Sequence, residues 1–255
     1  VNFTNNTSKV VATNDTGGNI SLQEPRSRNI RVTHIVGEKF GALYGSSYER
    51  DASGSIVHEM VNGIPIPKVG ARKILGFGVA PTQLGIGSSF RYKDFNASFL
   101  IEGKSGGQVY SGSNAYLKRN GHHKITVPAG GREAGFVPTG VMADGSTITT
   151  SIPAAQQEDY WRRSYLIAEQ DVVDSDYTRL RQMSIGYNIP SEKLKGTSIS
   201  SASISLIGRN LFFLSNSVDN IDPESAYNAG GGSAGLEYFA LPVPRTVGLN
   251  INLKF

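Results

Sequence analysis

The sequence predicts an all-β protein, an antiparallel transmembrane β-barrel. In several segments apolar and polar residues alternate with a period of two, so each strand has one apolar face and one polar face. The connections between these segments are alternately short turns and long loops, which is the arrangement of bacterial outer-membrane barrels. Together these features favour strands that cross a membrane.

The composition excludes several other classes of protein. The 255 residues include 25 Lys and Arg against 21 Asp and Glu, and a net charge of +4 is too small to indicate a nucleic-acid partner. Cysteine is absent, which excludes a disulfide scaffold and a thiol nucleophile. No apolar run approaches the roughly 18 residues of a spanning helix. No signal peptide opens the chain, so we expect the sequence to begin after a cleavage site or inside a longer protein.

The strand pattern is clearest in four segments. The first 25 residues are rich in Asn, Thr and Ser, and we expect a loop there. Two weaker strand candidates follow, at 30–44 and 56–61. The four strong candidates are 90–103, 177–188, 197–213 and 245–255. Leu100, Leu180 and Ile207 interrupt the alternation in their strands. In the last segment the apolar positions are Val247, Leu249, Ile251, Leu253 and Phe255.

The connections differ in length. Residues 189–196 form a short turn, in which Pro190 ends one strand and Gly196 precedes the next. Two long loops, at about 104–175 and 214–244, are rich in Gly and polar residues. Loops of this length are usually functional. Within the first of them we expect a helix over 156–168, with Trp161, Tyr165 and Ala168 on one face.

The polar face of the strands favours a barrel over a soluble sheet. It consists mostly of Ser, Asn, Gln, Thr and Gly, as expected for the wet interior of a wide barrel. Aromatic residues cluster near the strand ends, where interfacial girdles lie in membrane barrels. An extracellular β-sandwich with its apolar faces turned inward is the alternative that periodicity alone leaves open.

Enzyme motifs are not supported, so no catalytic or cofactor-binding residue is assigned. The segment 103–107 fits G-x-S-x-G, but Ser105 is followed by no acid and later histidine in the order that a hydrolase requires. The adjacent His122 and His123 would point to opposite faces of a strand, which disfavours a shared metal. A secreted hydrolase is the least favoured alternative.

Two acidic clusters and one aromatic-basic cluster lie in the loops. The acidic clusters are Asp171, Asp174 and Asp176, and Asp219, Asp222 and Glu224. Calcium prefers clustered carboxylates, but neither cluster has EF-hand spacing, so ordinary solvated loops are favoured and no metal is assigned. Trp161, Arg162, Arg163 and Tyr165 would stack on a sugar or bind an anion, or else form a packing cluster.

Several motifs, in order along the chain, resemble one family. Residues 176–190 are similar to S-Y-x-R-L-R-N-x-x-L-G-Y-x-L-P, and 205–212 end in G-x-N-L-F. Residues 221–224 match x-D-P-E, and 241–255 resemble x-P-x-P-R-T-x-x-x-G-x-x-x-x-F. Weaker matches occur at 36–45, 90–95, 106–107, 114–116 and 121–122. This ordered set resembles the C-terminal end of the SusC/RagA family, the TonB-dependent outer-membrane transporters of Bacteroidetes.

The resemblance implies that residues 1–255 are the C-terminal strands of a larger, 22-stranded barrel. The plug, the TonB box and the N-terminal domain of the family have no counterpart here. Six or seven strands cannot close such a barrel, because open edges leave backbone groups unpaired in lipid. The two long loops would face outward. The alternative is a small self-contained outer-membrane barrel or a surface adhesion module.

The implied function is nutrient import across the bacterial outer membrane, not catalysis. The substrate would be an oligosaccharide or a peptide, held under a SusD-like surface lipoprotein. The TonB complex would act through the absent N-terminal part, and the wall would contact membrane lipid. The five apolar positions of the last strand resemble the signal for the barrel-assembly machinery. We expect contacts with ligand or lid at Trp161, Arg162, Tyr165, Asp222 and Glu224.

Overall fold

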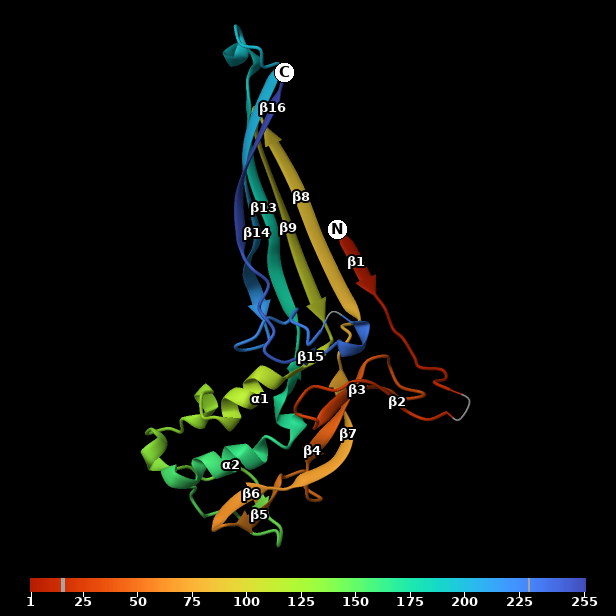
Figure 1. Ribbon diagram of the computed structural model, residues 1–255, viewed down its shortest axis with the longest axis vertical. Coiled ribbons are helices and arrows are strands. Elements are labelled where there is room, and N and C mark those ends of the chain that lie inside the picture. Colours follow the sequence, from red (N-terminus) through yellow and green to blue (C-terminus); the bar gives the residue numbers. More distant parts are fainter. Residues whose placement is uncertain (15–16, 229) are drawn as a thin grey trace.

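A tall antiparallel sheet stands on a smaller assembly of strands and helices (Figure 1). The computed structural model describes residues 1–14, 17–228 and 230–255. The tall sheet has six strands in the order β1-β8-β9-β13-β14-β16. Their bounds are β1 Asn2–Asn5, β8 Thr82–Tyr92, β9 Phe95–Ser105, β13 Tyr177–Ile189, β14 Ser201–Asn216 and β16 Thr246–Lys254. Six strands agree with the expected six or seven.

The register gives the sheet one apolar and one polar face. Directly opposed residues in antiparallel strands lie on the same face. One row across the sheet contains Phe90, Ala97, Ile185, Leu206 and Leu249. The next position along each strand gives a polar row, in which the Ser98 and Ser184 hydroxyls lie 2.7 Å apart. The apolar face is exposed, with Leu206 at 53% and Leu249 at 64%, as expected for a face that meets lipid.

A β-bulge explains one of the interruptions in the alternation. The register between β13 and both its neighbours shifts between Leu180 and Gln182, so Arg181 is an extra residue. Leu180 therefore stays on the apolar face, opposite Ile101, while Gln182 returns to the polar face. On β14 the matching irregularity places Asn210 at a φ of 53°.

Two expectations at the N-terminal side were wrong. The segment 90–103 is not one strand, because Lys93 and Asp94 form a two-residue turn between β8 and β9. Lys93 has a φ of 52°, and the alternation simply continues on both sides of the turn. The first 25 residues are not all loop: β1 pairs with β8, and β2 (Ile20–Gln23) pairs with β3.

Three small sheets form the assembly at one end of the tall sheet. The largest is β2-β3-β4-β7, with β3 at Ile30–His34, β4 at Ala42–Tyr48 and β7 at Val69–Phe77. The second is β12-β10-β15, at Val172–Asp174, Gln108–Ser111 and Leu236–Glu237. The third is β11-β5-β6, at Val141–Met142, Val57–Val61 and Ile64–Pro67. The expected strands at 30–44 and 56–61 are confirmed, the first as two strands.

Two helices cover this assembly. Helix α1 spans Gly112–Arg119 and was not predicted, because Gly, Ser and Asn at its start are poor helix formers. The hydroxyl of Ser111 caps it by accepting a hydrogen bond from the Asn114 amide. Helix α2 spans Gln157–Ser164, inside the predicted 156–168. Within the described residues no helix is long and apolar enough to cross a membrane.

Two hydrophobic clusters hold the assembly together. The first contains Ile30, Leu43, Tyr110, Ala168 and Leu236. It thus joins the three long connections between strands of the tall sheet, at 6–81, 106–176 and 217–245. The second contains Ile64, Ile152 and Tyr160, with Trp161 packed against it. The expected shared face of Trp161, Tyr165 and Ala168 is wrong. Helix α2 ends at Ser164, so Tyr165 and Ala168 turn to the first cluster while Trp161 stays in the second.

The two faces of β14 should respond oppositely to charge. In the full-length protein reconstituted in lipid vesicles, we expect Leu206→Arg to lower the free energy of unfolding by about 2 to 4 kcal/mol, because it places a cation in hydrocarbon. Guanidinium titration provides the measurement. Ser205→Arg, one residue away on the polar face, is the control and should cost far less. Equal losses for the two variants would contradict this assignment of the faces.

Candidate functional site

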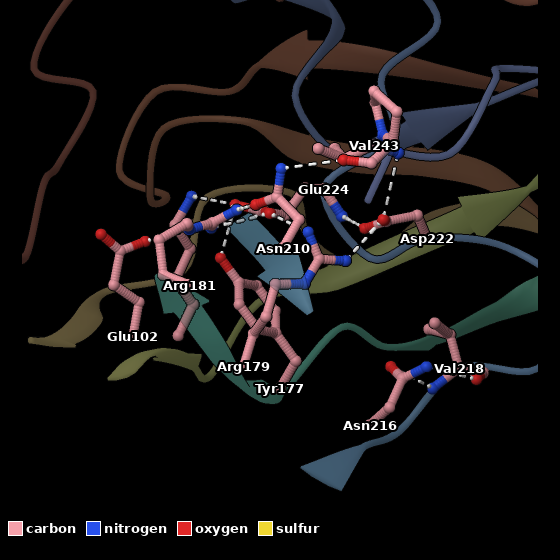
Figure 2. A network of polar contacts seen from close by, with 12 residues as sticks. Glu102, Tyr177, Arg179, Arg181, Asn210, Asn216, Val218, Asp222, Glu224 and Val243 are labelled. Carbon is pink, nitrogen blue, oxygen red and sulfur yellow. Dashed lines mark hydrogen bonds and ion pairs between the residues drawn. The ribbon is translucent and has the colours of Figure 1, made fainter. Parts of the chain in front are cut away.

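A cluster of charged side chains lies where the tall sheet meets its long loops (Figure 2). Tyr177 and Arg179 begin β13 and, two residues apart, share its polar face. Glu102 of β9 is the direct partner of Arg179 across the sheet. The bulge brings Arg181 to the same side, where its Nε donates to Glu102 Oε2 at 2.6 Å. Strand geometry therefore places two arginines side by side on one face.

The loop between β14 and β16 supplies the carboxylates. Arg179 donates from Nη2 to Asp222 Oδ2 at 2.5 Å and from Nη1 to Glu224 Oε2 at 2.8 Å. Arg181 donates from Nη2 to both oxygens of Glu224, at 2.7 and 2.8 Å. The Tyr177 hydroxyl donates to Glu224 Oε1 at 2.6 Å. These contacts are charge-assisted, which makes them the stronger kind of hydrogen bond.

The loop backbone is tied to the same cluster. Asp222 Oδ1 accepts from the Glu224 amide at 3.0 Å, and its Oδ2 accepts from the Val243 amide at 3.3 Å. Asn210, held in its left-handed conformation, accepts from Arg181 at 2.8 Å and donates to the Pro244 carbonyl at 3.1 Å. Both ends of the loop are thus fastened to the polar face of the sheet. We call the six residues Glu102, Tyr177, Arg179, Arg181, Asp222 and Glu224 the rim network.

The centre of the rim network is buried and its charges balance, while Glu102 at its edge is 38% exposed. The side chains of Arg179 and Asp222 are 3% and 4% exposed, and the Arg179 guanidinium lies 3.9 Å from the centre of the Phe213 ring. Lys104 adds a third cation, 3.9 Å from Glu224, so three cations face three carboxylates. Removing charge from water is costly, and complete pairing offsets that cost. A cavity of about 390 Å³ adjoins the network along Arg179, Asp222 and Arg245.

The network controls the ionisation of Glu224. Burial alone would raise the pKa of this carboxyl, but the hydrogen bonds from Tyr177 and Arg181 and the charges of both arginines outweigh it. The pKa of Glu224 is therefore held below its ordinary value of 4.5. Glu224 stays ionised, and its ion pairs stay intact, throughout the neutral range.

The five residues expected to contact ligand or lid are not brought together at one place. Asp222 and Glu224 belong to the rim network. Trp161 lies on α2, stacked against Phe136 with ring centres 5.9 Å apart. Arg162 pairs with Glu158 at 3.5 Å on the same helix, and the Tyr165 hydroxyl lies 3.3 Å from that of Tyr238. A contact of these residues with ligand or lid stays a prediction.

Sequence reasoning assigned no role to the arginines of β13. One usable signal was present, because Glu102 and Lys104 are charges on the polar face of β9. Arg179 and Arg181 were harder to find, since strict alternation counted back from Met183 places both on the apolar face, and only the bulge at Arg181 puts Arg179 on the polar side. The register places Val247, Leu249, Ile251 and Leu253 of β16 on one face as expected, and Phe255 follows the strand, 80% exposed. Their role in barrel assembly stays a prediction.

The histidine pair lies in the turn after α1 and not in a strand. His122 is exposed and His123 is buried, where its Nδ1 accepts from the Ile125 amide at 3.2 Å. Among the described residues, no group of three or more His, Asp or Glu side chains is placed to hold a metal ion. Of the first acidic cluster, Asp171 pairs with Lys118 at 2.7 Å, and burial raises the pKa of Asp171 to about 6.

Comparisons with known proteins show that the chain is similar to TonB-dependent receptors. No protein-family model matches the chain. It is 25% identical over 280 residues to TonB-dependent receptor P3 of Formosa agariphila, covering all of this chain and 26% of that protein. It is 27% identical over 240 residues to TonB-dependent receptor P26 of the same species, covering 88% of this chain and 23% of that protein. The chain thus spans about a quarter of these relatives.

The fold is that of part of the RagAB peptide importer. One solved structure, in the open-open state, gives a TM-score of 0.58 at 14% identity, covering 96% of this chain and 25% of that chain. The closed-closed state gives 0.57 at 14% identity, with 91% and 24% covered. The resemblance to SusC/RagA transporters, the partial-barrel fold and the location in a bacterial outer membrane are confirmed by these relatives.

Loss of the central arginine should destabilise the rim network strongly. Arg179→Met leaves Asp222 buried without its counter-ion, and we expect a loss of about 3 to 5 kcal/mol in the free energy of unfolding. Guanidinium titration of the full-length protein measures it. Arg209→Met is the control, because Arg209 is exposed on β14 and, within the described residues, its side chain bonds only to Gln182, at 3.5 Å; it should stay within about 0.5 kcal/mol. A similar cost for both variants would refute the role given to Arg179.

Acid should release the loop from the sheet. Because the pKa of Glu224 is lower folded than unfolded, its stabilisation is fully present above about 4.5 and is lost as pH falls through the folded value. Below pH 4.5 we expect the protection of the amides of residues 217–228 against hydrogen exchange to fall, when each rate is compared with the intrinsic exchange rate at the same pH. Glu224→Gln should remove this step. Persistence of the same step in the variant would show that another group titrates.

Proposed function

We propose that this chain is the C-terminal barrel section of an outer-membrane transporter that imports an oligosaccharide or a peptide with energy from TonB. Similarity to TonB-dependent receptors over the whole chain carries the proposal. The relatives are receptors and an importer, and accordingly no catalytic step is assigned to this protein.

The open edges of the sheet support a larger barrel. β1 and β16 each pair with one neighbour in the tall sheet. In lipid an unpaired edge costs several kcal/mol for each unsatisfied backbone group. We infer that strands outside residues 1–255 pair with both edges, and that the plug and the N-terminal domain lie in that other part. A closed bacterial barrel needs at least about eight strands, which disfavours a self-contained barrel.

The sidedness of the connections supports an outward-facing loop region. The turns after β8 and β13 are short, whereas 6–81, 106–176 and 217–245 are long and meet at the opposite end of the sheet (Figure 1). Short turns face the periplasm in such barrels and long loops face outward. The rim network and both helices would then lie on the substrate side, under a SusD-like lipoprotein. The apolar positions of β16 would be read by the barrel-assembly machinery, and the TonB complex would act through the absent N-terminal part.

Import by this protein should require TonB. In cells that carry the full-length gene, we expect uptake of a fluorescent oligosaccharide or peptide library to fall to background when TonB is deleted or the proton gradient is collapsed. Mass spectrometry of imported material then identifies the substrate class. A strain lacking this gene but retaining TonB is the control. Uptake that depends on the gene but not on TonB would overturn the proposal.

A further inference from the structure

A cavity of about 430 Å³ lies between the two helices of the loop region and is separate from the rim network. It is lined by the end of α1, the turn that follows it, residues near Arg132, and α2. This volume lies within the range of small-ligand sites. The lining residues that matter here are Arg119, Asn120, His122, Arg132, Gln157 and Trp161.

The cavity has a surplus of positive charge. Arg132 donates only to the Gly121 carbonyl, and Arg119 lies 5.1 Å from the centre of the Tyr165 ring. In the described part of the chain neither guanidinium has a carboxylate partner. The one carboxylate in the lining, Glu158, is 76% exposed and pairs with Arg162. Two forked guanidiniums beside one cavity match the geometry of a carboxylate or sulfate.

The remaining lining groups suit a polyhydroxylated ring. Gln157 uses its Nε2 on the Arg132 carbonyl, and Asn120 uses its Nδ2 on the Tyr116 carbonyl, so both amide oxygens stay available as acceptors. Trp161 lines the cavity with part of its indole, which is stacked on Phe136 and has its N–H buried. An aromatic face packs well on the C–H face of a sugar, and amide oxygens accept from hydroxyl groups.

We propose that this cavity binds an acidic sugar unit of an oligosaccharide, with Arg119 and Arg132 on its acid group and Trp161 against its ring. The inference rests on the proposed import function and narrows its substrate class. A peptide carboxylate would also satisfy the arginines, and peptide N–H groups would donate to the amide oxygens, so the preference for a sugar rests on Trp161, and the test below compares the two kinds of ligand.

The test uses the full-length protein purified in detergent. Isothermal titration calorimetry is run with tetrasaccharides of galacturonic, glucuronic and mannuronic acid, their methyl-esterified counterparts, and tetraglutamate. We expect at least one acid form to bind, its neutral ester to bind at least tenfold more weakly, and tetraglutamate to bind more weakly than the sugar. Binding should weaken with salt. Failure of all acid forms, equal binding of acid and ester, or preference for tetraglutamate overturns the proposal.

Matched variants connect the binding to the cavity. Arg119→Gln and Arg132→Gln should each weaken binding of the acid form about tenfold and leave the ester unaffected. Arg163→Gln is the control, because Arg163 lies on α2 but pairs with Asp159 and does not line the cavity; its affinity should be unchanged. Binding insensitive to both cavity variants would overturn the site. TonB-dependent uptake that persists in these variants would show that the transporter assignment survives without this cavity.

Discussion

The buried contact between Arg179 and Asp222 is the constraint on which the junction of sheet and loops depends. A guanidinium and a carboxylate that are almost fully removed from water are tolerable only when every charge is paired. That requirement draws in Glu224, Arg181 and Glu102, and through them two strands, β9 and β13, and one long loop. The bulge in β13 and the left-handed Asn210 are local departures from regular strand geometry that make this pairing possible. The ends of the loop are thus fixed to the polar face by charge, while Leu236 in its middle packs into the first hydrophobic cluster.

The rim network also gives a physical reason for the resemblance to SusC/RagA transporters. The four motifs at 176–190, 205–212, 221–224 and 241–255 are separate in the sequence. One residue from each of them, Arg179, Asn210, Asp222 and Val243, meets the others in this cluster (Figure 2). Each of the four motifs thus contributes a side chain or a backbone group to the pairing of buried charge.

Charge serves two different purposes in this chain. In the rim network, cations and carboxylates neutralise one another and leave no charge for a ligand. In the cavity between α1 and α2, Arg119 and Arg132 have no acidic partner, and amide oxygens and an indole surround them. The first arrangement holds the loop region in place, and the second leaves it able to select an anion. The hydrophobic cluster around Tyr110 and Leu236 joins these two regions into one body.

The sequence by itself determined the fold class, the two faces of the tall sheet and four of its six strands, β9, β13, β14 and β16, whereas β1 and most of β8 were not predicted. Alternation is a local property, so β13, β14 and β16 could be predicted from a few neighbouring residues. The sequence also located the helix near Trp161 and the long loop that carries Asp222 and Glu224. Only the tertiary structure decided that those carboxylates pair with Arg179 and Arg181, that a bulge turns Arg181 inward, and that Arg119 and Arg132 line one cavity with Trp161. These contacts join residues far apart in the chain, and no local pattern specifies them, because they depend on how the long connections pack against one another.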